Sequence, residues 1–306
     1  PESHGWVLVA RAQAGHDLVE QQRLYRQAIE TARRCGDVDL ECEALGSLGI
    51  MLVFSGHRVD GMGCLDEALG VLCADEVTDL SVIEGVFCGL FHACERVNDV
   101  GRAAQWLRAV DGVVRRRGFV AVGGYCRAYY GGLLTAAGRW PEAEAELAAA
   151  LSVFSAEHRA VHASLRCRLA ELRREQGRLE EAAVLLDGLD HLEDAVRPLA
   201  ATQLARGELD LARDLLERTV AAGGLEDVPT ARLLSLLVET HLERGDPAAA
   251  EPVVRRLADL AALQGGSFVP ALTELARGRR CLAEGRTTRA RDHLHEALTG
   301  FVRAEM

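Results

Sequence analysis

Cysteine and histidine side chains are the residues of this sequence whose types and spacing could do chemistry. Cys88 and His92 lie four residues apart in CGLFHACE, and Cys94 follows two residues later. Residues four apart share one face of a helix, where a thiolate and an imidazole can bind one metal ion. His158 and His162, in EHRAVH, have the same spacing. The histidine pair has no identifiable third ligand, and no HExxH or CxxC motif occurs. For Cys88, His92 and Cys94 the simpler interpretation is side chains that pack or line a groove, so we expect no metal site.

Other catalytic constellations are excluded by residue type. All 35 basic residues are arginine, and without lysine the chain has neither a Walker-A phosphate loop nor a Schiff-base nucleophile. No Gly-x-Ser-x-Gly elbow occurs. The nine cysteines are odd in number and scattered along the chain, which is typical of small buried residues in a reducing cytoplasm. We therefore expect no enzyme activity, no cofactor and a cytoplasmic location.

The glycines and aromatic residues of YYGGLLTAAGRWPEAEAELAAAL, residues 129–151, belong to a repeat. Gly138 is followed by Ala143 five residues later and by Leu147 four residues after that. Stricter or looser copies of this spacing begin at positions 16, 56, 98, 138, 177, 207, 245 and 285. The usual step is 38 to 42 residues, a period typical of solenoids in which each unit buries its apolar face against its neighbours.

One repeat predicts a helical hairpin. The first helix is expected over 118–137 and ends at Gly138, where a positive φ costs glycine nothing. The second is expected over 140–154, with Pro141 in its first turn, where a missing amide donor does no harm. Small Ala143 allows close approach of the two helices, and Leu147 fills the groove between them.

The predicted fold is all-α, a right-handed superhelical solenoid of about eight such hairpins with a period of about 40 residues. We expect one continuous array, with units 1–5 in residues 1–187 and units 6–8 in 188–306. The interval between Gly177 and Gly207 is only 30 residues long, with a turn at Gly188 and with Pro198 near the start of a short helix. This shortened unit, near 188–206, is either a tolerated deletion or a hinge or subdomain boundary.

The first helix of each hairpin is expected to line the concave surface. Alignment of the units on their turns places seven candidate site residues there: Cys88, His92, Glu95, Tyr125, Tyr129, Cys167 and Glu171. Small residues beside tyrosines, with a buried His–Glu pair, would suit a small ligand or a peptide. The alternative is that these side chains only pack against the neighbouring helix. Arginines 127, 166 and 174 are candidates for an anion contact, or for solubility alone.

Charge and hydropathy limit the partners. The net charge of −11, with no lysine, makes direct binding of nucleic acid unfavourable. The sequence has no apolar run of about 18 residues and no signal peptide at its start, so we expect no membrane association. The predicted partner is another protein or a small-molecule effector. A homodimer is a further expectation, because the end after Phe301 and Val302 looks uncapped.

The repeat resembles the tetratricopeptide repeat (TPR). One copy of the pattern has Leu48–Gly49, Gly56, Leu65 and Ala68; a second has Tyr130–Gly131, Gly138, Trp140, Ala143, Leu147 and Ala150. The tryptophan that TPR units carry early in the first helix is replaced here by Leu45 or Arg127, and the first unit is degenerate.

Residues 35–300 more closely resemble the TPR-like region of actinobacterial LuxR-type transcriptional regulators. The most specific stretch runs from Ala93–Cys94–Glu95 through Asp99 and Arg102–Ala103 to Trp106. In that family the array precedes a helix-turn-helix DNA reader. The resemblance implies a non-catalytic region for protein interaction or effector sensing in such a regulator. The alternative is a stand-alone receptor that binds a small molecule in its concave groove.

Overall fold

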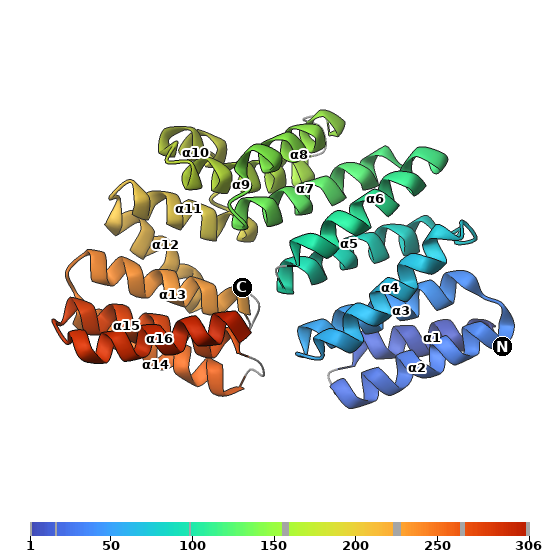
Figure 1. Ribbon diagram of the computed structural model, residues 1–306, viewed down its shortest axis with the longest axis horizontal. Helices are drawn as coiled ribbons and strands as arrows, with labels where there is room; N and C mark the ends of the chain where they lie inside the picture. Colours follow the sequence, from blue (N-terminus) through green and yellow to red (C-terminus); the bar gives the residue numbers. More distant parts are fainter. Residues whose placement is uncertain are drawn as a thin grey trace. The chain divides into compact units, whose positions relative to one another are not determined.

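The computed structural model describes residues 2–15, 17–97, 99–154, 159–222, 228–263 and 267–303. Across these ranges the chain forms sixteen α-helices and no β-strand. Consecutive helices pair as hairpins, each odd-numbered helix packing against the even-numbered helix that follows it (Figure 1). The prediction of an all-α solenoid of about eight helical hairpins is confirmed.

The chain divides into two compact units, residues 1–157 and 158–306. Unit 1 contains α1 (Glu2–Ala14), α2 (Leu18–Cys35), α3 (Val38–Phe54), α4 (Arg58–Cys73), α5 (Leu80–Val97), α6 (Val100–Arg117), α7 (Val120–Ala136) and α8 (Trp140–Val153). Unit 2 contains α9 (Arg159–Glu175), α10 (Leu179–Leu186), α11 (Glu193–Ala205), α12 (Leu209–Ala222), α13 (Val228–Glu243), α14 (Pro247–Leu263), α15 (Phe268–Ala283) and α16 (Thr287–Arg303).

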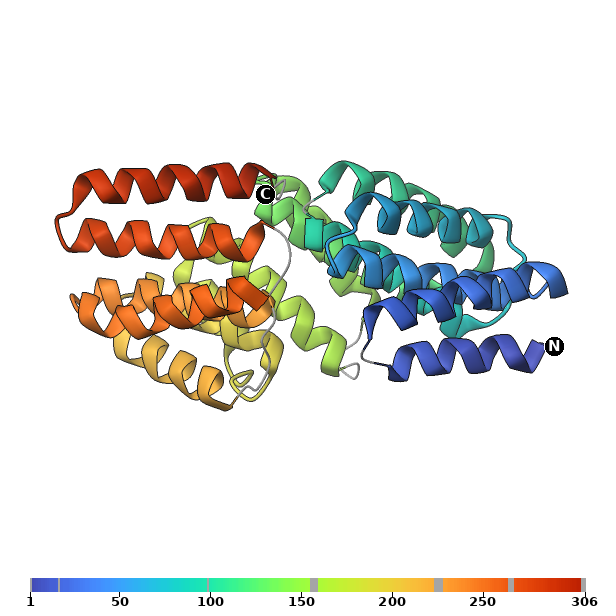
Figure 2. The ribbon, with the colours of Figure 1, turned by 90° about the horizontal axis from the view of Figure 1, so that it is seen from below.

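Within each unit the first helices of successive hairpins form a row. In unit 1, α3 contacts α1 and α5, and α5 also contacts α7; in unit 2 the same relation links α9, α11, α13 and α15. Each second helix covers its own partner, and all but the last one in each unit also touch the first helix of the next hairpin, as the stacked ribbons of Figure 2 show. The first helices therefore bring residues one repeat apart onto a common face.

The turns follow the predicted spacing. Gly138 has a φ of 73° and ends the first helix of its hairpin, and the amide of Arg139 donates to the carbonyl of Leu134 at 2.9 Å. Glycine adopts this left-handed conformation without the steric cost that a Cβ would add. The other predicted turn glycines, at 56, 177, 207, 245 and 285, also have positive φ. His16 and Asn98, the two looser turn positions, lie outside the described residues.

A glycine on the first helix lets the two helices of a hairpin touch. A Cβ built on Gly131 would lie 2.6 Å from Cγ of Leu147, whose side chain is fully buried. The same arrangement recurs at Gly49 with Leu65, and at Gly278 with Leu294. The expectation that close packing explains a glycine inside this helix is confirmed.

Replacing Gly131 by alanine is expected to destabilise unit 1 by about 1–3 kcal/mol, because the new methyl group overlaps Leu147 in a tightly packed core. Gly63 in α4 is the matched control, since a Cβ there meets no atom within 4 Å. Gly63→Ala should instead stabilise the helix by about 0.5–1 kcal/mol. Guanidinium denaturation followed by tryptophan fluorescence measures both, and equal midpoints for the two variants would contradict this packing argument.

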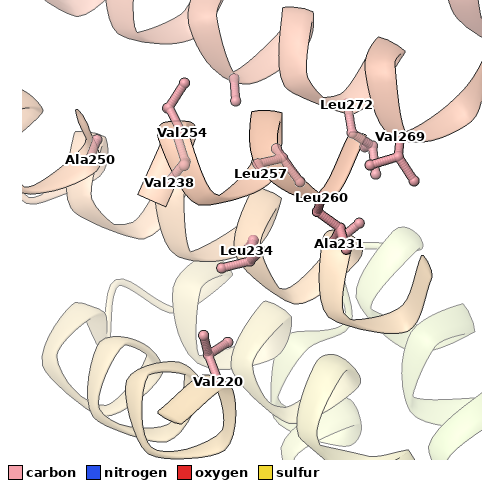
Figure 3. Packing of buried hydrophobic residues seen from close by; sticks show 11 residues of the cluster. Val220, Ala231, Leu234, Val238, Ala250, Val254, Leu257, Leu260, Val269 and Leu272 are labelled. Atoms are coloured by element: carbon pink, nitrogen blue, oxygen red, sulfur yellow. The ribbon is translucent and has the colours of Figure 1, made fainter. Parts of the chain in front are cut away.

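The core of unit 2 is built from successive hairpins. One cluster joins α12 to α15: Val220, Ala231, Leu234, Val238, Ala250, Val254, Leu257, Leu260, Val269, Leu272 and Ala276 (Figure 3). Two further clusters lie between α9 and α11 and between α11 and α14. No single helix of this unit could bury its apolar side alone, which is the physical reason for the repeat.

The shortened interval is visible in the helices. Between Gly177 and Gly207 lie α10, of only eight residues, and α11, of thirteen residues with Pro198 inside it. Gly188 adopts a φ of 73° at the predicted turn. The predicted boundary at 187/188 and the hinge in 188–206 stay predictions.

No helix in the described ranges is long and apolar enough to cross a membrane.

Candidate functional site

The start of α5 is held by α3. The carboxylate of Asp39, on α3, accepts hydrogen bonds from the amides of Thr78 and Asp79 at 2.7 and 2.9 Å. Asp79 in turn caps α5 by accepting from the hydroxyl and the amide of Ser81 at 2.6 and 2.8 Å, and these hydrogen bonds, the one from the hydroxyl first, lower the pKa of the Asp79 carboxyl. These bonds satisfy amides that the helix itself leaves unpaired. They therefore help to fix the position of α5 beside α3.

Two glycines set how closely α3 and α5 pack. A Cβ on Gly46 would lie 2.8 Å from Cγ2 of Val86, and a Cβ on Gly89 would overlap the side chain of Ile50. Larger residues at these glycines would push the helices apart or shift them along their axes. The two glycines therefore determine which residues of α3 and α5 lie next to each other.

On the far side of α5, α7 is held by an arginine. Arg127 donates to both carboxylate oxygens of Asp111 on α6 at 2.8 Å and to Glu146 on α8 at 2.7 Å. Arg127 was a sequence candidate for binding an anionic ligand, but both its partners are carboxylates of the protein itself. Its charge is already neutralised within the fold.

Three of the predicted site residues meet across α5 and α7. Nε2 of His92 lies 2.5 Å from the hydroxyl oxygen of Tyr129, and their rings pack edge-to-face with centroids 4.6 Å apart. Tyr125, one turn earlier on α7, packs against Tyr129 with a centroid distance of 5.2 Å. Tyr129 is buried, Tyr125 is half-buried and His92 is exposed. His92 is therefore not buried as expected, and the His–Glu pair itself stays a prediction, whereas the rings of His92, Tyr125 and Tyr129 do form a cluster.

Cys88 and Glu95 lie on α5, one turn before and one turn after His92, and both are half-buried. Burial raises the pKa of the Cys88 thiol, and the nearby Glu84 carboxylate raises it further. Burial also raises the pKa of Cys126 on α7, with Cys88 as a second cause. Because the thiolate is the nucleophilic and metal-binding form, these shifts leave both cysteines poorly suited to either role.

A contact between the ends of α3 and α5 was not predicted from the sequence. The guanidinium carbon of Arg96, on α5, lies 5.7 Å from the ring centroid of Phe54 at the end of α3. Arg96 follows His92 by one helical turn, which is the signal that could have identified it. We call the surface formed by Ile50, Phe54, Cys88, His92, Arg96, Tyr125 and Tyr129 the α3–α5–α7 face.

The remaining two predicted residues belong to α9 in unit 2. Cys167 is buried, and desolvation, with Asp194 and Glu171 as further causes, raises the pKa of its thiol to about 11. Glu171 forms an ion pair with Arg197 on α11. A protonated thiol and a neutralised carboxylate offer no nucleophile or base here. These side chains stabilise the contact of α9 with α11.

The other two arginine candidates are engaged locally. Nε and Nη2 of Arg166 each donate at 2.8 Å, to the carbonyls of Leu185 and Asp187 at the end of α10. Arg174 donates to the adjacent Glu175 at 2.5 Å. Arg166 therefore caps carbonyls that α10 leaves unpaired, and its role is structural.

Two further observations bear on ligand chemistry. Within the described residues, no group of three His, Cys, Asp or Glu side chains is placed to hold a metal ion. An open depression of about 420 Å³ lies between α9 and α10, lined by Leu169, Arg173, Glu180, Glu181, Val184 and Leu185. None of the seven predicted site residues lines this depression.

Comparison with known proteins rests on structure, because no family model and no curated protein matches the sequence. A tetratricopeptide repeat protein from Parabacteroides merdae superimposes with a TM-score of 0.55 at 16% identity, covering 89% of this chain and 98% of that one. BtubC (BKLC) from P. vanneervenii matches with a TM-score of 0.40 at 18% identity, covering 81% of this chain and 92% of that one. The TPR domain of P58(IPK) matches with a TM-score of 0.26 at 12% identity over 99% of both chains. The first of these similarities places this chain among TPR-like folds.

Proposed function

We propose that this chain is a non-catalytic docking array that binds a segment of another protein on the α3–α5–α7 face. The observation that supports the proposal is the cluster of His92, Tyr125 and Tyr129, where two polar rings remain accessible beside a buried tyrosine. Aromatic side chains with a polar atom combine a large contact area with hydrogen bonding, and they are enriched where proteins bind one another. The residue chemistry favours recognition over reaction, because the neighbouring thiols are held protonated.

The sequence suggests the class of protein in which such a docking region would work. The stretch from Ala93–Cys94–Glu95 to Trp106 resembles the TPR-like region of LuxR-type transcriptional regulators. On this basis we propose a cytoplasmic sensing or scaffold region, whose partner or effector changes the output of a transcription factor. The acidic chain itself would leave DNA binding to a separate module.

The test is a selection of short random peptides displayed on phage against the full chain. We expect the wild-type chain to enrich peptides, and the double variant His92→Ala/Tyr125→Ala to bind them on the order of tenfold more weakly or worse. Both replaced side chains are at least partly exposed, so the variant should keep its fold. Circular dichroism checks that it does.

A matched control lies on α16 in unit 2. His295 and Leu298 are also exposed, and His295→Ala/Leu298→Ala should leave peptide affinity unchanged. Equal loss in both double variants would place binding elsewhere on the chain. Failure of the wild-type chain to enrich any peptide would refute the docking function itself.

A small-molecule effector is the alternative occupant of the same face, and isothermal titration against fractions of cell extract distinguishes it from a protein partner. Heat in fractions of low molecular weight, lost in His92→Ala/Tyr125→Ala, would favour the receptor. The proposal also allows the array to act as a homodimer, which sedimentation equilibrium measures directly.

A further inference from the structure

Arg96 differs from the other half-buried arginines described in unit 1. Arg102 pairs with Asp66 at 2.9 Å, Arg117 with Asp75 at 2.5 Å, and Arg58 approaches Asp99 at 3.6 Å. Arg127, as described above, has two carboxylates. Arg96 contacts the ring of Phe54 but forms no ion pair with any carboxylate that the structure describes.

This lack of a partner has a free-energy cost. Burial lowers the pKa of the Arg96 guanidinium, since removal of water disfavours the charged form. An aromatic ring attracts a cation over its face, but it does not satisfy the N–H donors in the plane of the guanidinium. Arg96 therefore presents unused charge-assisted donors on a surface where part of the desolvation has already occurred.

The surroundings of Arg96 fit a ligand rather than a structural role. His92 lies one turn before it on α5, and Phe54 at the end of α3 is half exposed beside it. On the corresponding first helices of unit 2, Arg197 pairs with Glu171 and Arg279 with Glu239 at 2.6 Å, while the guanidinium carbon of Arg232 lies 5.1 Å from the ring centroid of Phe268. Because no carboxylate among the described residues pairs with Arg96, its guanidinium gives the α3–α5–α7 face a positive group that can accept a negative one.

We propose that the segment docking on the α3–α5–α7 face carries an aspartate or glutamate side chain that pairs with Arg96. The flat guanidinium, which lies over the Phe54 ring, would present two parallel N–H groups to that carboxylate, the geometry in which arginine binds carboxylates most strongly. A neighbouring residue of the segment would then pack on Tyr125 and His92. This inference rests on the proposed docking function. It specifies in addition that the docking segment carries a negative charge.

The experiment repeats the phage selection with Arg96→Gln and compares the selected peptides. Wild-type chain should enrich aspartate and glutamate above their frequency in the starting library, and Arg96→Gln should lose that excess. A synthetic peptide from the wild-type pool is then measured against both chains. Its affinity should fall roughly tenfold to hundredfold in Arg96→Gln, the range for loss of a hydrogen-bonded charge.

Two matched variants control this result. Arg108 on α6 is exposed and has no ion pair among the described residues, so Arg108→Gln changes net charge equally and should leave affinity unchanged. Changing the acidic residue of the peptide to its amide should weaken binding to wild type but not to Arg96→Gln. Arg96→Lys should recover part of the affinity, because it keeps the charge but not the planar pair of donors.

The outcomes separate the two proposals. Peptides enriched without an acidic excess, or with the same excess on Arg96→Gln, would overturn the role of Arg96 and leave docking intact. No enrichment on the wild-type chain would overturn both. The melting temperature gives a further check, because removing an unpaired, partly desolvated charge should not lower it. A marked drop in Arg96→Gln would show that Arg96 is structural.

Discussion

Replacing Phe87 by alanine is expected to lower the free energy of unfolding of unit 1 by about 3–5 kcal/mol, because a fully buried phenyl ring leaves a large cavity when it is removed. Phe87 is 0% exposed and lies on α5. This helix contacts α3, α4, α6 and α7, so the cavity would open where the central hairpins of the unit meet. Little of the surrounding core can collapse into it without shifting a helix.

Tryptophan fluorescence measures this effect in unit 1 alone. All three tryptophans, Trp6, Trp106 and Trp140, lie in unit 1, whereas circular dichroism at helical wavelengths reports both units. In Phe87→Ala the fluorescence transition should move to lower denaturant, with a second dichroism transition left in place. Phe54→Ala is the matched control: its ring is 50% exposed, and the loss should stay below about 1 kcal/mol. An equal shift of both signals in Phe87→Ala would show that the chain unfolds as one block.

Replacing Leu257 by alanine is expected to destabilise unit 2 by about 2–5 kcal/mol, the range for truncating a buried leucine. Leu257 is 0% exposed, at the centre of the cluster that joins α12 to α15 (Figure 3). The hydroxyl of Thr273, on α15, lies 3.3 Å from the Leu257 carbonyl oxygen and 3.0 Å from that of Val269, one turn earlier on its own helix. Loss of the side chain therefore loosens α14 where it supports the next hairpin.

Here the two signals should respond in the opposite way. The dichroism transition of Leu257→Ala should shift while the tryptophan transition stays, because unit 2 contains no tryptophan. Leu263→Ala is the control on the same helix, since its side chain is 66% exposed and its loss should cost less than about 0.5 kcal/mol. A comparable loss in both leucine variants would contradict the assignment of the core.

The hairpins could be predicted because their determinants are local. The glycine at each turn, the alanine five residues later and the leucine after it lie within about three helical turns of one another. Their spacing therefore places them directly. Gly138 and Gly131 show this: one adopts the positive φ that its position requires, and the other touches Leu147 as the small-residue pattern indicates. The short interval before Gly207 was likewise evident from spacing alone.

The face that these helices present was only partly predictable. His92, Tyr125 and Tyr129 were identified from the alignment of turns, but their exposure and mutual contacts depend on the offset between α5 and α7. That offset arises from contacts between residues about one repeat apart, such as His92 and Tyr129, and hydrophobic periodicity does not encode it.

The sequence by itself therefore determined the repeat, the hairpins and the residue types of the candidate face. The tertiary structure alone decided which charged side chains of these helices are neutralised. Arg127 was predicted as an anion contact, yet α6 and α8 bring Asp111 and Glu146 to it. Arg96 was not a candidate residue in the sequence. In the structure it contacts the ring of Phe54 on α3 and pairs with no carboxylate among the described residues. The physical reason is that an ion pair between helices depends on distances set by packing, and each guanidinium binds whatever carboxylate the fold places within its reach.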